Sequence, residues 1–184
     1  MVLLESQVKL KKGDQAPDFE LLGIDDKKHN LSEYKQKDGI LVIFMCNHCP
    51  YVKAKFDAFN EIQDKLGDKI AIVGINSNDS TDYPEDSFEN MKKTANERGI
   101  QFDYLWDETQ EIAKKYGAMC TPDPFLFNKE GKLVFHGRID NAMKPDDVAT
   151  EKTMIVNIER MLSNEKIEKD FDPSIGCSIK WKEN

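Results

Sequence analysis

The feature that most constrains this chain is an apolar run that leads directly into two cysteines. Residues Ile40 to Met45 are all apolar and mostly branched, a pattern typical of a buried β-strand. The segment Cys46-Asn47-His48-Cys49-Pro50 follows at once. Beyond it, apolar residues at helical spacing predict an amphipathic helix whose inward face consists of Val52, Phe56, Phe59, Ile62 and Leu66. The two cysteines are therefore expected where a buried strand turns into a helix.

Such a junction favours a thiolate. The first N–H groups of a helix lack backbone partners and, together with the helix dipole, attract negative charge. A protonated His48 between the sulfurs adds to this attraction, so the pKa of a cysteine should fall from about 8.5 into the range of roughly 3.5–7.5. We interpret Cys46 as a nucleophile and Cys49 as the thiol that resolves a mixed disulfide at Cys46. Asn47 and His48 are candidates for tuning this pair.

Two other interpretations of the cysteine pair are weaker. Half of a zinc site needs a second ligand pair of similar spacing, which the sequence lacks. Inert core cysteines do not explain the polar Asn47 and His48 between them or Pro50 after them, which suit a loop that faces solvent. The pattern therefore favours redox chemistry.

Length and charge further limit the fold, the partners and the location that this chain can have. The chain has 184 residues, enough for one domain with a substantial core. Its formal net charge of −8, without a block of basic residues, argues against nucleic acid or an anionic membrane as a partner. The sequence shows no leader and no membrane span, so we expect a cytoplasmic protein. There, four cysteines indicate redox or metal chemistry rather than structural disulfides.

The rest of the chain alternates strands and helices. A second buried strand is expected at residues 70–75 and, because a helix connects it to the first, the two should be parallel. The loop from Asn76 to Pro84 leaves the same sheet edge, and either lines a groove beside Cys46 or is an ordinary solvated loop. Further elements are predicted as a strand around Phe19 and Leu21, a helix at 85–98 that ends at Gly99, a strand at 102–106, a helix at 109–116 that ends at Gly117, a β-hairpin at 125–135 and a helix at 151–162.

We divide the chain into a lead-in at residues 1–12, one domain at 13–170 and a tail at 171–184. The lead-in is expected to be a loose or edge segment. The tail holds Ile175, Cys177 and Trp181 and is too apolar for a free linker, so it should pack on the body.

Several motifs together resemble a known superfamily. Thr121-Pro122 precedes the predicted hairpin, and a proline entering a strand belongs at its first position or at a bulge. This pair, the strand–Cys46-x-x-Cys49–helix unit and Gly13-x-x-Ala16-Pro17-x-Phe19 resemble thioredoxin-like proteins, in particular the branch of TlpA-type thiol–disulfide oxidoreductases and AhpC/TSA peroxiredoxins. Within that branch, the chain is similar to small proteins that share Cys-Asn-His-Cys-Pro and Gly-Cys-Ser-Ile-Lys-Trp.

The resemblance implies an α/β thioredoxin fold, in which helices flank a central mixed β-sheet, with an N-terminal β extension and a C-terminal tail packed on the body. It implies that Cys46 attacks and Cys49 resolves. Pro122 matches a cis-proline beside the disulfide, and Thr121 matches the residue whose backbone pairs with a substrate strand. The histidine at position 48 matches that of DsbA-type sites, which implies a potential above that of thioredoxin.

The implied activity is thiol–disulfide oxidoreduction. The substrates would be protein or small-molecule thiols and disulfides, and a thioredoxin or glutathione system would be the electron donor. The implied redox group is the disulfide itself, with no cofactor and no metal.

The sequence also departs from the superfamily. Thioredoxins place a buried acid in the strand before the motif and a tryptophan before the first cysteine, whereas this strand is apolar and ends in Met45. Peroxiredoxins need Thr or Ser three residues before the peroxidatic cysteine, where this chain has Ile43 before Cys46 and Cys46 before Cys49. A thiol-dependent peroxidase is therefore the alternative enzyme, without its usual pocket.

Cys120 and Cys177 allow further hypotheses. One or both form a second thiol station near Cys46, or both are small buried hydrophobic residues. Soft thiolates with an imidazole also suit Cu(I), so a copper-binding or redox-sensing module without turnover is the alternative outside enzymes. Against copper, we expect the His48 side chain to point away from the sulfurs.

Overall fold

The structure is a computed structural model that describes residues 2–183. Its strands are β1 (Leu3–Glu5), β2 (Glu20–Gly23), β3 (Lys28–Asn30), β4 (Gly39–Phe44), β5 (Ala71–Asn76), β6 (Asp103–Trp106), β7 (Cys120–Thr121), β8 (Asp123–Asn128), β9 (Leu133–Gly137), β10 (Phe171–Asp172) and β11 (Ile175–Ser178). Its helices are α1 (Pro50–Lys53), α2 (Phe56–Leu66), α3 (Phe88–Arg98), α4 (Glu111–Tyr116) and α5 (Thr153–Leu162), with 3₁₀ helices η1 (Leu31–Gln36) and η2 (Pro84–Asp86).

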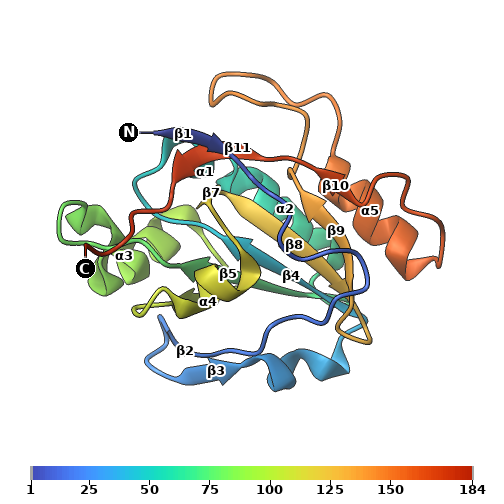
Figure 1. Cartoon of the computed structure of the whole chain (residues 1–184), viewed down its shortest axis with the longest axis horizontal. Helices are drawn as coiled ribbons and strands as arrows, with labels where there is room; N and C mark the ends of the chain where they lie inside the picture. Colours follow the sequence, from blue (N-terminus) through green and yellow to red (C-terminus); the bar gives the residue numbers. More distant parts are fainter. Residues whose placement is uncertain (1, 184) are drawn as a thin grey trace.

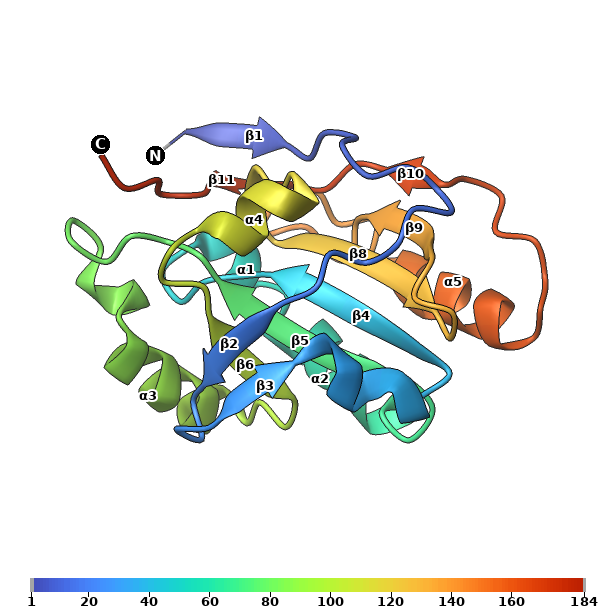
Figure 2. The ribbon, with the colours of Figure 1, turned by 60° about the horizontal axis from the view of Figure 1, so that its bottom comes forward.

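A mixed sheet of eight strands, in the order β10-β9-β8-β4-β5-β6-β2-β3, forms the centre of the molecule. Helices cover both of its faces (Figure 1, Figure 2). The strands β4, β5 and β6 are parallel, while β8 runs antiparallel to β4. The predicted α/β architecture, the parallel pair of buried strands and the β-hairpin, formed by β8 and β9, are thus confirmed.

The central strand β4 carries the core on both faces, because all six of its residues are buried. Leu41 and Ile43 belong to the cluster that packs against α1, α2, α3 and α5. Val42 and Phe44 alternate with them and join the second cluster, which includes Tyr116 of α4. A continuous apolar run is therefore needed at this position, and it gave the clearest strand signal in the sequence.

The strand directions bring the sequence landmarks to one edge of the sheet. The parallel strands β4, β5 and β6 all end there, and antiparallel β8 begins there. In the β4–β8 register Phe44 lies opposite Asp123, so the residues just after Phe44 meet those just before Asp123. Cys46 and Thr121 are thereby neighbours although 75 residues separate them in the chain.

The helix predicted after the cysteines is broken into two. Ala54 and Lys55 separate α1 from α2, and the Lys55 backbone N–H bonds to the Val52 carbonyl, a tighter turn than the α-helical one. The Lys55 side chain turns to Asp140, with Nζ 2.5 Å from a carboxylate oxygen. The inward face is kept across the break, since Val52, Phe56 and Phe59 are all buried.

Helix α3 begins at Phe88 rather than at residue 85, because η2 occupies the preceding turn and the Ser87 hydroxyl caps α3 by accepting from Asn90 N–H. The predicted glycine ends of α3 and α4, Gly99 and Gly117, both adopt the left-handed conformation. Among the described residues, no helix is both long and apolar enough to span a membrane.

The tail packs on the body, as predicted. Strand β11 lies between β1 and β7 in a separate three-stranded sheet, with both pairings antiparallel (Figure 1). Cys177 is opposite Leu3 on one side and opposite Thr121 on the other. The lead-in thus contributes an edge strand, β1, and the tail contributes the strand that covers the edge of the sheet where the cysteines lie.

The inward face of α2 offers a test of the core. Phe59 is fully buried between α2 and the sheet, so Phe59→Ala should lower the free energy of unfolding by about 3–5 kcal/mol. Asp64 is exposed on the same helix, and Asp64→Ala should change it by less than about 0.5 kcal/mol. Chemical denaturation measures both; similar losses for the two variants would contradict this packing.

Candidate redox site

Cys46 and Cys49 lie at the end of β4 and are both fully buried. Cys46 is in the loop after the strand, and Cys49 is the N-cap residue of α1, with Pro50 at its first position. The expectation of a solvent-facing loop is wrong, because Asn47 is also buried. β11 covers one side of the motif, and the segment that ends in η2 covers the other.

Three sulfur atoms meet at this edge. The Sγ atoms of Cys49 and Cys177 are 2.8 Å apart. Cys46 Sγ lies 3.3 Å from the Thr121 hydroxyl, and Cys49 Sγ lies 3.3 Å from the Thr121 carbonyl oxygen. Cys46 and Cys49 also interact, since each shifts the pKa of the other. Cys49 is therefore the central sulfur, with a thiol partner on each side.

The pKa values of the two motif cysteines shift in opposite directions. Hydrogen bonds from the thiols of Cys177 and Cys46 lower the pKa of Cys49, against the opposing effect of burial. Burial raises the pKa of Cys46, and the hydrogen bond to Cys49 and the charge of Asp86 act in the same direction. The stabilised thiolate is thus Cys49 rather than Cys46. A physical reason is that the helix begins at Cys49, so Cys46 does not lie at its N-terminus.

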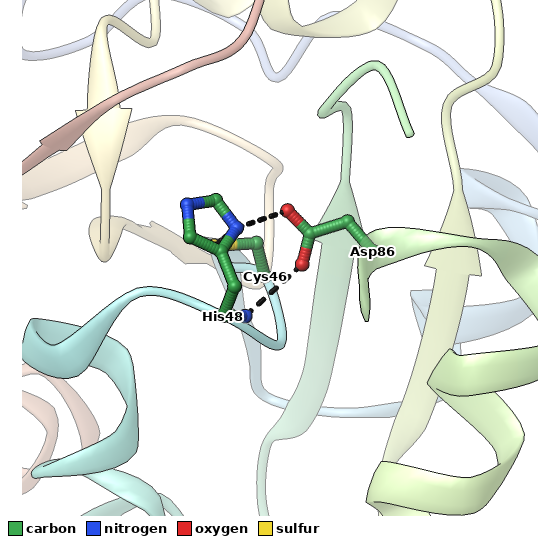
Figure 3. A group of neighbouring side chains, drawn as sticks. All are labelled: Cys46, His48 and Asp86. Carbon is green, nitrogen blue, oxygen red and sulfur yellow. Dashed lines mark hydrogen bonds and ion pairs between the residues drawn. The ribbon is translucent and has the colours of Figure 1, made fainter. Parts of the chain in front are cut away.

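A buried aspartate that the sequence analysis missed holds the motif in place. The Asp86 carboxylate accepts hydrogen bonds from the backbone N–H groups of Asn47 (2.7 Å) and His48 (3.1 Å). It also lies 2.5 Å from His48 Nδ1 and accepts from Asn78 Nδ2 at 2.7 Å. Figure 3 shows the His48 ring and backbone nitrogen directed at the two oxygens of this carboxylate. The long loop after β5 was the available signal, because its far end supplies Asp86.

His48 lies beside Cys46, and the expectation that it points away from the sulfurs is wrong. Its Nδ1 is 4.0 Å from Cys46 Sγ, and its ring stacks on Tyr83 at a centroid distance of 4.6 Å. The other ring nitrogen, Nε2, is buried without a hydrogen-bond partner in the described structure. Asp86 thus fixes which ring nitrogen faces the thiol.

Asn47 is held on both sides of the motif loop. Its side-chain nitrogen donates to the Glu85 carbonyl at 2.8 Å, and its side-chain oxygen accepts from the Tyr104 hydroxyl at 3.0 Å. Asn47 therefore ties the loop to η2 and to β6 rather than facing solvent.

The remaining predicted residues divide into two groups. Thr121-Pro122 is a cis peptide beside the sulfurs, and Thr121 pairs with Cys177 of β11. Cys120 is buried with its Sγ 4.0 Å from the Pro122 carbonyl oxygen, and burial raises its pKa. Since neighbouring side chains of a strand point to opposite faces, Cys120 faces away when Thr121 faces Cys46. The structure brings Cys177 to the pair and leaves Cys120 apart.

One group of atoms has the proximity of a metal site. A sulfur of Cys46, a nitrogen of His48 and an oxygen of Asp86 lie within 4.8 Å of one another. The nitrogen and the oxygen are already paired with each other at 2.5 Å. Zinc accepts thiolate, imidazole and carboxylate ligands, whereas Cu(I) prefers soft donors, so the Asp86 carboxylate argues against copper at this group.

Residues 12–136 match the AhpC/TSA family. The chain belongs to this family. The thiol-disulfide oxidoreductase ResA of Bacillus anthracis is 29% identical over 127 residues, which are 68% of this chain and 69% of that protein. An uncharacterized conserved protein from Geobacillus kaustophilus, of known structure, is 39% identical, with a TM-score of 0.93 over 100% of this chain and 98% of that chain.

Membership of the AhpC/TSA family agrees with the predicted branch, and solved structures confirm the thioredoxin fold. The thioredoxin domain of a thiol-disulfide oxidoreductase from Bacteroides vulgatus, 20% identical, superposes with a TM-score of 0.60 over 70% of this chain and 89% of that domain. The family match ends at residue 136, so it does not include β11 or Cys177.

The charge of Asp86 makes a pH-dependent prediction. Asp86→Asn removes a negative charge that raises the pKa of Cys46, so this pKa should fall and alkylation of Cys46 should begin at lower pH. Mass spectrometry of the native protein alkylated across a pH series measures the shift. Glu85→Gln, one residue away and exposed, is the matched control. An unchanged profile for Asp86→Asn, or an equal shift for Glu85→Gln, would contradict the assignment.

Proposed function

We propose that this protein is a thiol–disulfide oxidoreductase that cycles between a Cys46, Cys49 dithiol and a Cys46–Cys49 disulfide. The observation that carries the proposal is the meeting of a stabilised Cys49 thiolate with the Cys46 thiol beside the Thr121 hydroxyl and carbonyl. The names of the curated relatives support the same activity.

The hydrogen bond between the two cysteines supplies a route for the proton. As Cys46 attacks a substrate disulfide, its proton passes to the Cys49 thiolate, and the first substrate sulfur leaves as a thiolate. That thiolate takes the proton from Cys49. The Cys49 thiolate then attacks the sulfur of Cys46, the second substrate thiolate leaves, and the Cys46–Cys49 disulfide remains. The reverse sequence oxidises a dithiol.

This chemistry suggests the class of substrate, the electron donor and the reduction potential. We propose protein or small-molecule disulfides and thiols as substrates, and a thioredoxin or glutathione system as the electron donor. A stabilised Cys49 thiolate favours the reduced form, which supports a potential above the value of about −270 mV typical of thioredoxin. We further propose a cytoplasmic location, because a reducing compartment keeps cysteines available for exchange.

Two alternatives have less support. For a peroxidase, Thr121 places a hydroxyl beside Cys46, but Ile43 stands where peroxiredoxins need Thr or Ser. For a copper carrier, the donors around Cys46 include the hard carboxylate of Asp86. A redox-sensing module without turnover would use the same cysteines but would not catalyse exchange.

The test is the redox equilibrium of the metal-free protein in glutathione buffers, with cysteine positions mapped by mass spectrometry. We expect one two-electron couple whose oxidised form includes the Cys46–Cys49 disulfide, and catalysis of exchange in a model disulfide substrate. Cys46→Ser and Cys49→Ser should reduce catalysis to the uncatalysed rate, because each removes one of the two exchanging sulfurs.

Cys120→Ser is the matched control, because this buried cysteine is next to Thr121 but outside the sulfur cluster. It should keep the activity. Failure of the wild-type protein to form any Cys46–Cys49 disulfide, or full activity of Cys46→Ser, would refute the exchange mechanism.

A further inference from the structure

The strand β11 presents a cysteine to the redox pair in the manner of a bound peptide. Its backbone pairs antiparallel with β7, with Cys177 opposite Thr121 and Ser178 opposite Cys120. The sulfur of Cys177 lies 2.8 Å from Cys49 Sγ, and all three sulfur-bearing residues are fully buried. A sulfur held this close to the central cysteine is positioned for exchange.

Several contacts fix this position. Gly176 passes so close to Thr121 that a Cβ at this residue would collide with the Thr121 carbonyl oxygen. Directly after Cys177, Ser178 N–H bonds to the Val2 carbonyl (2.8 Å) and Ile179 N–H bonds to the Met119 carbonyl (3.0 Å). The tail is therefore anchored to β1 and to the residue before β7, and Cys177 has little freedom to move away from Cys49.

We infer that Cys177 is a third redox residue, which attacks Cys49 in the Cys46–Cys49 disulfide and carries the disulfide onto β11. The Cys177 sulfur forms a bond with Cys49 Sγ as the Cys46–Cys49 bond breaks. Cys46 leaves as a thiolate and takes up the proton that Cys177 gives up. One disulfide is exchanged for another, so no external oxidant or reductant is needed. The inference rests on the proposed exchange function.

The electrostatics change in favour of this step once the pair is oxidised. In the dithiol form, the hydrogen bond to Cys49 and burial raise the pKa of Cys177, so Cys177 holds its proton. When Cys49 is part of a disulfide, it carries no charge. Its hydrogen bond then no longer raises the pKa of Cys177. Burial still raises the pKa of Cys177, and the charge of Lys180 still lowers it. Cys177 thus becomes a better nucleophile when its target has formed.

The consequence for turnover is that Cys46 becomes a thiol again while the chain still stores one disulfide. Cys46 can then attack a second substrate before the chain meets its electron donor. After the exchange, the electron donor must reduce the Cys49–Cys177 disulfide, which joins the body to the tail.

The experiment oxidises the full-length protein in glutathione buffers, quenches with acid, alkylates the remaining thiols and maps the disulfides. In the wild type we expect both Cys46–Cys49 and Cys49–Cys177, with part of the oxidised protein alkylated at Cys46. Cys177→Ser should show Cys46–Cys49 only and lose alkylation of Cys46. Cys46→Ser should form Cys49–Cys177 directly, and the control Cys120→Ser should match the wild type.

Gly176→Ala tests the same step with every cysteine in place. It should displace β11 from Thr121 and lower the share of Cys49–Cys177 on the order of tenfold, because exchange depends on holding the two sulfurs together. Far-ultraviolet circular dichroism checks that each variant remains folded.

The outcomes separate this inference from the proposed function. Wild-type protein with Cys46–Cys49 alone, together with glutathione on Cys49 in Cys46→Ser, would overturn the role of Cys177 and leave the exchange function intact. An unchanged share of Cys49–Cys177 in Gly176→Ala would overturn the positioning by β11. No Cys46–Cys49 disulfide in Cys177→Ser would refute the proposed function itself.

Discussion

The Asp86 carboxylate accepts hydrogen bonds from two backbone amides of the cysteine motif and pairs with the His48 ring. Because this aspartate is fully buried, its carboxylate depends on hydrogen bonds from those donors and from the Asn78 side chain. The loop of the motif, the end of β5 and η2 must therefore come together as one unit. The position of Cys46 at the sheet edge depends on this unit, as does the orientation of His48 toward it.

A second constraint acts from the other side of the sulfurs. Strand β11 pairs with β7 at Thr121. The residue Lys180, after β11, contacts the segment 77–86, which contains Asp86. Lys180 N–H donates to the Asn78 side chain at 2.9 Å, and the Lys180 ammonium lies over the Tyr83 ring. Tyr83 in turn stacks on His48. The tail and the segment 77–86 together cover the cysteines. This explains why a motif that was expected to face solvent is buried.

The sequence predicted the features that local patterns encode. The run ending in Met45, the inward face of α2, and Gly99 and Gly117 each follow from periodicity or backbone conformation, and each has the expected structure. The opposite pKa shifts of Cys46 and Cys49 were not predicted, because they depend on hydrogen bonds and charges from residues far along the chain. Asp86 was missed for a similar reason: one acid among 34 Asp and Glu residues has no local signature of burial.

The order of strands in the small sheet has a consequence for synthesis. Strand β1 precedes every other strand in the described chain and β11 follows them all, yet the two are paired. Because a chain grows from its N-terminus, the domain can fold around Cys46 and Cys49 before β11 has left the ribosome. During that interval the two sulfurs have no strand over them and β1 has no partner on that side. Folding of the strands that precede β11 would therefore leave the redox site open until β11 pairs with β1 and β7.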